Sequence, residues 1–255
     1  MLKKRIIPVQ LLIHGRLVKT QRFGDYRDVG DPVKSSGVYN SQQADELIFL
    51  NISREACSVQ PLAKLIERVS EECFMPLAVG GGIRSFEDAA FLIQNGADKV
   101  VINSAAFEQP EIITAVAERF GAQACIVGMD AAWDEKEKRY ILYAHCGRER
   151  HGERDLQEFI RAMEARGAGE IFIQSIDRDG TMSGYDTRLI ASVMEVSTVP
   201  VIAGGGSGNY EHLRSAFAET NVSALACGSI FNFSDSNPIR AKAFLENHGL
   251  HFKKV

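Results

Sequence analysis

The segments ADELIFLNI (residues 44–52) and AGEIFIQSI (residues 168–176) match each other across a spacing of 124 residues. Each contains a continuous apolar run instead of an alternation of apolar and polar residues. Such runs are typical of parallel strands that are covered on both faces. The two segments therefore predict two copies of one buried strand in an α/β fold.

The same spacing relates further segments downstream of each strand. GGGIRSFE (80–87) aligns with GGGSGNYE (204–211), and NSAAF (103–107) aligns with CGSIF (227–231). Several matches at one spacing predict two similar halves of four βα units each. Since neither a linker nor a low-complexity tract interrupts the chain, we expect residues 1–255 to form a single domain.

Short β-rich runs alternate with amphipathic helical runs, such as 86–95 and 110–119, along the whole chain. Eight such units in about 250 residues predict a (β/α)8 TIM barrel with a two-fold half-barrel repeat. RYILYAHCG (139–147) is predicted to be an extra strand in a hairpin that turns at 134–138. The predicted barrel strands are 5–12, 46–51, 76–79, 99–103, 124–130, 170–175, 200–203 and 224–228.

The composition excludes several classes of protein. With 45% hydrophobic and 24% charged residues the chain is an ordinary globular protein, and its net charge of -4 does not favour nucleic acid or anionic lipid. Five cysteines without a C-x-x-C pair indicate a reducing, cytoplasmic location rather than a disulfide framework or zinc site. Pro8 and Gln10 interrupt the N-terminal apolar run, so we expect neither a signal peptide nor a membrane span.

Each glycine triplet follows an apolar strand and precedes a helix. Glycine allows the backbone to approach a ligand closely, and the start of a helix offers unpaired N–H donors. The alternative is that the glycines only form tight turns, but two related copies favour a ligand with a phosphate at each end. The predicted phosphate-binding residues are Gly81, Gly82, Asn103, Ser104, Gly205, Gly206 and Ser229.

The loop SIDRDGTMSGYD (175–186) follows the sixth predicted strand, at the end of a barrel where catalysis takes place. The density of Asp and Gly favours a loop that contacts a polar substrate or acts as a lid, and the alternative is a solvated loop. The residues assigned to this substrate loop are Asp177, Asp179, Gly180 and Thr181.

Asp130 ends the fifth predicted strand, where barrel enzymes place acids and bases. When 7–11 is laid on 126–130, Asp130 faces Leu11. Lys19, in the loop after the first strand, is a second candidate catalytic residue that could meet an anionic substrate. The alternatives are a helix cap or buried acceptor for Asp130 and a solvated side chain for Lys19.

Four charged residues begin predicted strands at the opposite end of the barrel: Arg5, Glu46, Lys99 and Glu170. They are either solvated charges or an ion-paired ring that closes the barrel axis. The histidines form no ligand cluster in the sequence, so we assign no metal and no cofactor.

Several motifs together resemble the cyclase subunit family of imidazole glycerol phosphate synthase over nearly the full chain. They include KRIIP (4–8), GGGIR (80–84), GADKV (96–100), DRDGT (177–181) and NHG (247–249). The resemblance implies a (β/α)8 barrel that pairs with a class I glutaminase subunit. Ammonia would pass through the barrel to a bisphosphorylated ribulosyl aminoimidazole carboxamide nucleotide, which is converted to imidazole glycerol phosphate and an aminoimidazole carboxamide ribonucleotide.

The resemblance also implies roles for residues. The four charges at the strand starts correspond to an ammonia gate, and Asp98 corresponds to a contact with the glutaminase. Of two catalytic aspartates in the family, one falls on Asp130 and the other falls on Leu11, which cannot exchange a proton. Asn51 replaces an aspartate, and Gly204 replaces the first residue of an SGG triplet.

Other words, such as LVKT (17–20) and KVVINSAAF (99–107), resemble a divergent branch associated with lipopolysaccharide O-antigen genes. That branch implies ammonia supply to a separate N-acetyl sugar amidotransferase, which forms an acetamidino group on a nucleotide-sugar. The alternatives are an active cyclase of histidine biosynthesis, a noncatalytic subunit that activates the glutaminase, or an isomerase of the same superfamily. Because Leu11 replaces an acid, the sequence leaves open whether the chain is itself an enzyme.

Overall fold

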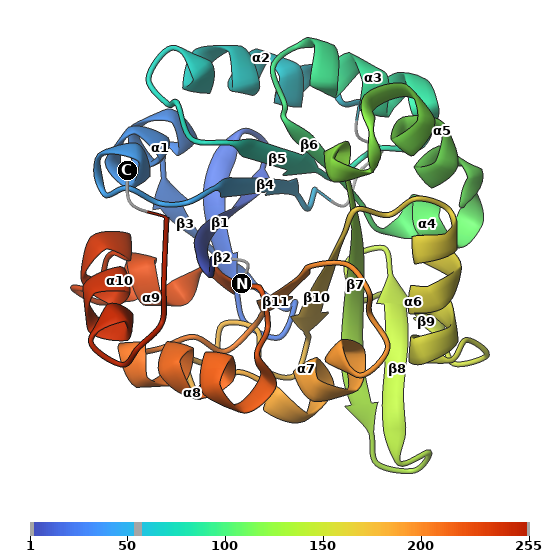
Figure 1. The fold of residues 1–255 in the computed structure, drawn as a ribbon. Coiled ribbons are helices and arrows are strands. Elements are labelled where there is room, and N and C mark those ends of the chain that lie inside the picture. The colour runs from blue at the N-terminus through green and yellow to red at the C-terminus, as the bar shows by residue number, and fades with distance from the viewer. Residues whose placement is uncertain (1–2, 54–57, 254–255) are drawn as a thin grey trace.

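The computed structural model describes residues 3–53 and 58–253. Within these residues, eight parallel strands close into a barrel, because β1 pairs with both β4 and β12 while β7 pairs with both β6 and β10 (Figure 1). This confirms the predicted (β/α)8 barrel. The barrel strands are β1 (Arg5–Ile13), β4 (Leu47–Asn51), β5 (Leu77–Gly80), β6 (Lys99–Ile102), β7 (Cys125–Asp134), β10 (Glu170–Ser175), β11 (Val201–Gly204) and β12 (Ala224–Cys227).

Helices surround the barrel on the outside (Figure 1). Many begin at a side chain that caps them: Ser85 accepts a hydrogen bond from the Asp88 N–H, and Asn209 from the His212 N–H. No helix in the described part of the chain is both long and apolar enough to cross a membrane. The helices are α1 (Pro32–Ser41), α2 (Gln60–Ser70), α3 (Phe86–Gln94), α4 (Ser104–Glu108), α5 (Glu111–Phe120), η1 (Ala122–Ala124), α6 (Leu156–Ala165), α7 (Thr187–Met194), α8 (Tyr210–Thr220), α9 (Ser229–Phe233) and α10 (Pro238–Glu246).

Two antiparallel extensions rise from the barrel. β8 (Arg139–Ala144) pairs with the end of β7, and β9 (Glu149–His151) pairs with β8, which confirms the predicted hairpin. The second extension is β2 (Arg16–Thr20) with β3 (Tyr26–Gly30), where a loop after the first strand was predicted. β1 reverses into β2 through His14 and Gly15, both with positive φ as a two-residue hairpin turn requires.

Equivalent positions in the two halves of the barrel have the same backbone conformation, but the number of residues that separates them is not constant along the chain. Gly81 and Gly205 have φ of 93° and 95°, at the predicted spacing of 124 residues. The residues before α4 and α9 also share a conformation, with φ and ψ of -112° and -86° at Asn103 and of -115° and -85° at Gly228. Asn103 therefore corresponds to Gly228, so the alignment of NSAAF with CGSIF was wrong by one residue. The extra residue lies between the second triplet and β12.

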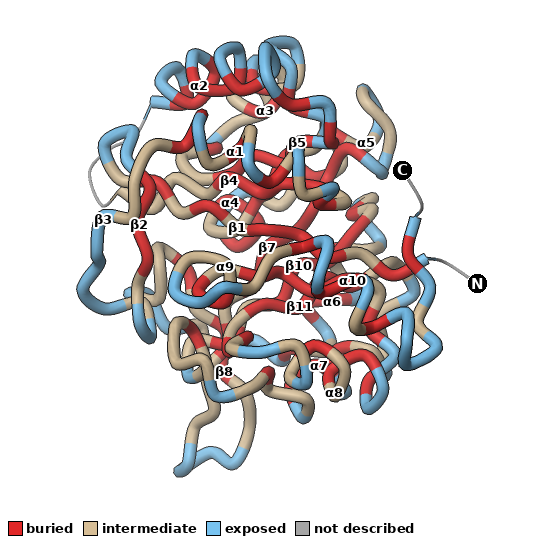
Figure 2. The backbone as a smooth tube through the Cα atoms, turned by 90° about the vertical axis from the view of Figure 1, so that its left-hand side faces the viewer, coloured by how far each residue is buried: buried red, intermediate tan, exposed pale blue. Residues whose placement is uncertain are grey.

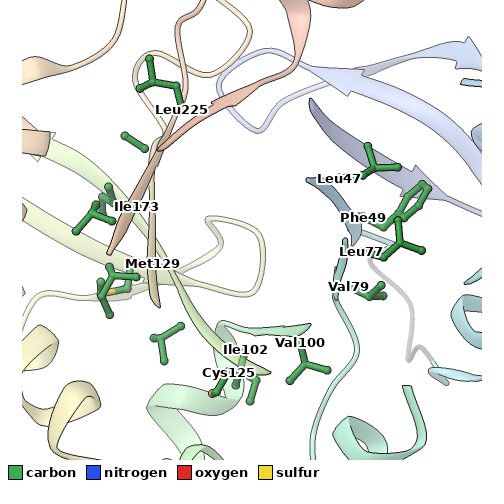
Figure 3. Packing of buried hydrophobic residues seen from close by; sticks show 14 of the residues in the cluster. Leu47, Phe49, Leu77, Val79, Val100, Ile102, Cys125, Met129, Ile173 and Leu225 are labelled. Atoms are coloured by element: carbon green, nitrogen blue, oxygen red, sulfur yellow. The ribbon is translucent and has the colours of Figure 1, made fainter. Parts of the chain in front are cut away.

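Hydrophobic side chains form two regions. The larger lies between the strands and the surrounding helices, where alternate strand residues such as Leu47, Phe49, Leu77 and Val79 point outward (Figure 3). Figure 2 shows the buried parts of the backbone running through the middle of the molecule. The smaller fills the barrel interior. Its buried members are Ile7, Ile48, Ala78, Val101, Ile126, Phe172, Ile202, Ala224 and Ala226. Because side chains alternate along a strand, residues two positions before or after these also face the interior.

Candidate functional site

A cavity of about 400 Å³ opens where the barrel strands end. Residues of the barrel strands that face the interior form the floor of the cavity. They include Val9, Val101 and Phe172. The seven residues predicted to bind phosphate all line this cavity: Gly81, Gly82, Asn103, Ser104, Gly205, Gly206 and Ser229. The structure thus brings them to one place, while their binding of phosphate stays a prediction.

The glycine triplets pass very close to neighbouring strands. A Cβ atom added to Gly81 would lie 2.0 Å from the Asn51 carbonyl oxygen, and one added to Gly205 would lie 2.7 Å from the Ser175 carbonyl oxygen. Both residues also have positive φ. Packing alone therefore requires glycine at these two positions, whatever the cavity binds.

A polar wall lies along β6, β7 and β10. The Asn103 Nδ2 donates to Asp130 Oδ2 at 3.0 Å, and Gln174 on β10 is the strand partner of Asp130. Burial raises the pKa of Asp130 to about 7; the Asn103 hydrogen bond opposes this shift and the charge of Asp179 adds to it. Asp130 is thus placed to gain or lose a proton near neutral pH.

Lys19 lies on β2 and not in the predicted loop, because β1 turns directly into β2 at His14. Its side chain enters the cavity and is buried, and Nζ donates to the Val9 carbonyl oxygen at 2.5 Å. Burial lowers the pKa of Lys19 to about 8, against the charges of Asp179 and the Cys227 thiol group. The alternative of a solvated Lys19 side chain is therefore excluded, while a catalytic role of Lys19 stays a prediction.

An apolar wall faces the polar one. Leu11 on β1 lies beside Leu50 on β4, and both line the cavity. β1 and β7 are four strands apart in a ring of eight, so Leu11 stands on the side of the mouth opposite Asp130. A leucine at this position can neither donate nor accept a proton.

The loop after β10 divides into two parts. Asp179 and Gly180 line the cavity, and the buried Asp179 carboxylate accepts hydrogen bonds from Thr20 Oγ1 at 2.8 Å and the Phe23 N–H at 3.3 Å. Burial raises the pKa of Asp179, although these hydrogen bonds act against it. The other two predicted residues form hydrogen bonds with backbone groups. Asp177 accepts from the Trp133 N–H, and Thr181 donates to the Arg178 carbonyl oxygen.

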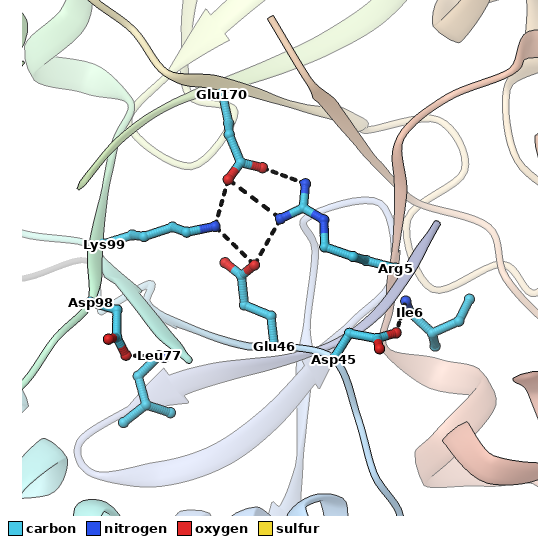
Figure 4. A network of polar contacts seen from close by, with 8 residues as sticks. All are labelled: Arg5, Ile6, Asp45, Glu46, Leu77, Asp98, Lys99 and Glu170. Atoms are coloured by element: carbon cyan, nitrogen blue, oxygen red, sulfur yellow. Dashed lines mark hydrogen bonds and ion pairs between the residues drawn. The ribbon is translucent and has the colours of Figure 1, made fainter. Parts of the chain in front are cut away.

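At the other end of the barrel, the four charged residues of the strand starts form an ion-paired ring across the axis (Figure 4). Glu46 Oε2 lies 2.9 Å from Arg5 Nη1 and 2.9 Å from Lys99 Nζ. Glu170 pairs with the same two cations, at 2.5 Å in each case. Glu46 is 2% exposed and Glu170 is 7% exposed, so the alternative of solvated charges is excluded.

The two carboxylates of the ring differ in their electrostatics. Burial raises the pKa of Glu46, and the charges of Lys99 and Arg5 only partly offset it. Burial acts in the same direction on Glu170, but hydrogen bonds and charges from Arg5 and Lys99 outweigh it and hold its pKa below the ordinary value. Removing either carboxylate would leave two cations sharing one partner.

An apolar layer separates the ring from the cavity. Ile7 lies two residues after Arg5 and two before Val9, and Ile48 lies in the same way between Glu46 and Leu50. This alternation stacks charge, apolar layer and cavity in order along the barrel axis.

Asp98 lies beside the ring at the strand-start end and is exposed. Its Oδ2 accepts from the Leu77 N–H at 2.8 Å, which ties β6 to β5 (Figure 4). In the described ranges, 3–53 and 58–253, no group of three His, Cys, Asp or Glu side chains is placed to hold a metal.

Gln174 and the β2–β3 hairpin were not predicted from the sequence. Gln174 follows Glu170 and Phe172 at steps of two along one strand, so it faces the interior as they do. This alternation was a usable signal. The hydrogen bond between Thr20 of the hairpin and Asp179 joins residues that are 159 positions apart. No pattern of neighbouring residues in the sequence indicates it.

Asp130→Asn is expected to stabilise the protein more at pH 8 than at pH 5. A carboxyl whose pKa is raised on folding is destabilising when ionised; this cost is absent below its unfolded pKa, near 3.8, and complete above about 7. Allowing for its partial exposure in the cavity, we expect a gain of about 1–3 kcal/mol at pH 8. Urea denaturation at both pH values measures it. Leu11→Asn, which adds no titrating group to the same mouth, is the control, and a gain as large at pH 5 would contradict the shift.

Comparison with known proteins finds, among other matches, one family model and one relative that cover nearly the whole chain. The model of a family described as histidine biosynthesis protein matches residues 5–237. The imidazole glycerol phosphate synthase subunit HisF of Staphylococcus carnosus (strain TM300) is 39% identical over 250 residues, which cover 98% of each chain.

Proposed function

Since this chain belongs to the histidine biosynthesis protein family and is HisF-like, we propose that it is the ammonia-receiving barrel subunit of a glutamine amidotransferase. The observation that carries the proposal is the ion-paired ring of two cations and two buried carboxylates at one end of the barrel, in line with the cavity at the other. A ring that pairs all its charges can close the axis to water while its members remain free to exchange partners.

We propose a class I glutaminase as the partner, docked over the ring. The relative is named as a subunit, which supports a partner protein. Asp98 is the proposed contact because it is exposed beside Lys99 and, with one oxygen bound to Leu77, keeps the other for a donor of the partner.

We further propose that the ammonia serves acetamidino-sugar formation in surface polysaccharide synthesis, by a separate N-acetyl sugar amidotransferase. Support comes from Leu11, which removes the acid opposite Asp130 but affects neither the ring nor the glycine triplets. A phosphorylated compound or nucleotide-sugar would then occupy the mouth through the triplets, Ser104 and Ser229, with Asp179 and Gly180 beside it.

A second candidate is ring closure as in imidazole glycerol phosphate synthase, which the identity to HisF favours. Lys19 and Asp130 support it, because their pKa values of about 8 and about 7 would allow an alternative acid–base pair in one cavity. A third candidate is a noncatalytic subunit that only activates the glutaminase.

The test of the partner is to mix the purified barrel with its cognate glutaminase and to measure complex formation by calorimetry and glutamate release from glutamine. We expect a one-to-one complex with stimulated glutaminase activity. Asp98→Asn, which can still accept from Leu77, should weaken binding by roughly ten-fold through loss of a charged hydrogen bond. Asp177→Asn at the opposite end is the control. A barrel that does not bind the glutaminase would refute the proposal.

The acetamidino role is tested by adding the N-acetyl sugar amidotransferase and its nucleotide-sugar to this complex. With ATP supplied to activate the acetamido oxygen as a leaving group, we expect its glutamine-dependent replacement by NH, detected by mass spectrometry. Formation of the acetamidino sugar at the same rate without the barrel would exclude this role.

A further inference from the structure

Gln174 occupies the space that a side chain at position 204 would fill. The two residues are direct strand partners on β10 and β11. A Cβ atom added to Gly204 would lie 2.0 Å from Gln174 Oε1 and 2.9 Å from the Phe172 ring. The carboxamide of Gln174 therefore lies over the bare backbone of Gly204.

The carboxamide is held at one atom and lines the cavity. Its Nε2 donates to Asp179 Oδ1 at 3.1 Å, and Gln174 lines the cavity between Asp130 and the second glycine triplet. Gly205, the next residue of that triplet, lies against Ser175 and the Asp179 N–H. A ligand bound at the triplet would thus lie next to Gln174.

We propose that Gln174 is a specificity-determining residue that reads a hydroxyl group of the ligand next to the phosphate at Gly205 and Gly206. The inference rests on the phosphate site of the proposed function and adds the group that is recognised beside it. A carboxamide offers an acceptor, Oε1, and a second N–H that is not used by Asp179. A hydroxyl both donates and accepts, so it matches these two atoms, while a methylene group in the same place would leave them unpaired.

The test uses three probes that differ in one feature at a time: inorganic phosphate, n-propyl phosphate and glycerol 3-phosphate. The last two have the same three-carbon chain and differ only in hydroxyl groups. Dissociation constants are measured by NMR titration of the full-length protein. We expect glycerol 3-phosphate to bind about three- to ten-fold more tightly than propyl phosphate, the range for one neutral hydrogen bond.

Gln174→Met keeps the length of the side chain and removes its hydrogen-bonding groups. It should bring glycerol 3-phosphate to the affinity of propyl phosphate and leave the affinity for inorganic phosphate unchanged. Gln10→Met is the matched control, because Gln10 is also a glutamine of a barrel strand but is buried and donates to Ser35 outside the cavity. It should leave the discrimination between the probes unchanged.

Gly204→Ala is a second, independent variant. Its methyl group would lie 2.0 Å from Gln174 Oε1 and displace the carboxamide, so it should abolish the same discrimination while residue 174 remains a glutamine. Retained discrimination in Gln174→Met, or none in the unmodified protein while inorganic phosphate binds, would overturn the inference alone. If inorganic phosphate fails to bind, the phosphate site of the proposed function fails and the inference fails with it.

Discussion

Glu170→Ala is expected to lower the free energy of unfolding by about 3–5 kcal/mol, because it breaks a buried ion-pair network on one side. Glu170 pairs with both Arg5 and Lys99 at 2.5 Å. Without it, two half-buried cations share the buried Glu46, and one positive charge is left uncompensated in the barrel. Such a loss is a large part of the 5–15 kcal/mol that is typical of a whole domain. Urea denaturation at neutral pH measures it.

Glu211→Ala is the control for this experiment, since Glu211 pairs with Arg214 on the exposed surface of α8. It should change the unfolding midpoint very little. Glu170→Gln, which keeps the shape but loses the charge, should fall between the two. A Glu170→Ala protein as stable as the Glu211→Ala protein would show that the ring does not hold the barrel closed.

Leu11→Asp is expected to raise the ring-closing rate with ammonium salts and the bisphosphorylated nucleotide by about 10²–10⁴-fold, the range for one placed acid or base. Leu11 and Asp130 stand on opposite sides of the mouth, so the new carboxylate would supply the second proton-transfer group. The rate is measured by the absorbance of the aminoimidazole product under saturating ammonia, without the glutaminase.

Two variants separate proton transfer from polarity. Leu11→Asn has the size and polarity of the aspartate variant but cannot transfer a proton, and it should show no gain. Leu11→Asp combined with Asp130→Asn should lose the gain. An equal increase in the asparagine variant would mean that polarity alone had limited the reaction, and the acid–base explanation would be wrong.

The fold could be predicted from the sequence because each strand is indicated by its own run of apolar residues. The continuous apolar runs near 46–51 and 170–175 and their common spacing predicted the barrel, which the strand pairing confirms. The charges at the strand starts were recognisable as a set for the same reason. Their pairing was not, since it depends on the barrel closing with Arg5 beside both Glu46 and Glu170.

Features that depend on backbone reversal or on distant packing were not predictable. Lys19 was predicted to lie in a loop because His14 and Gly15 suggest the end of a strand, whereas they form a two-residue turn between two strands. Gly204 was recognised as a departure from the family, but its partner Gln174 could be identified only through the pairing of β10 with β11. The extra residue before β12 was not predicted because the two glycine triplets, which precede it, align at the spacing of 124 residues.

The most direct test of the central claim, that this barrel receives ammonia without closing the imidazole ring, is a single assay of the barrel–glutaminase complex. The complex is given glutamine and the bisphosphorylated nucleotide, and glutamate and imidazole glycerol phosphate are measured together. We predict glutamate release without imidazole product above a control that lacks the barrel. Imidazole product formed at a rate ordinary for enzymes, roughly 1–10³ per second, would contradict the claim.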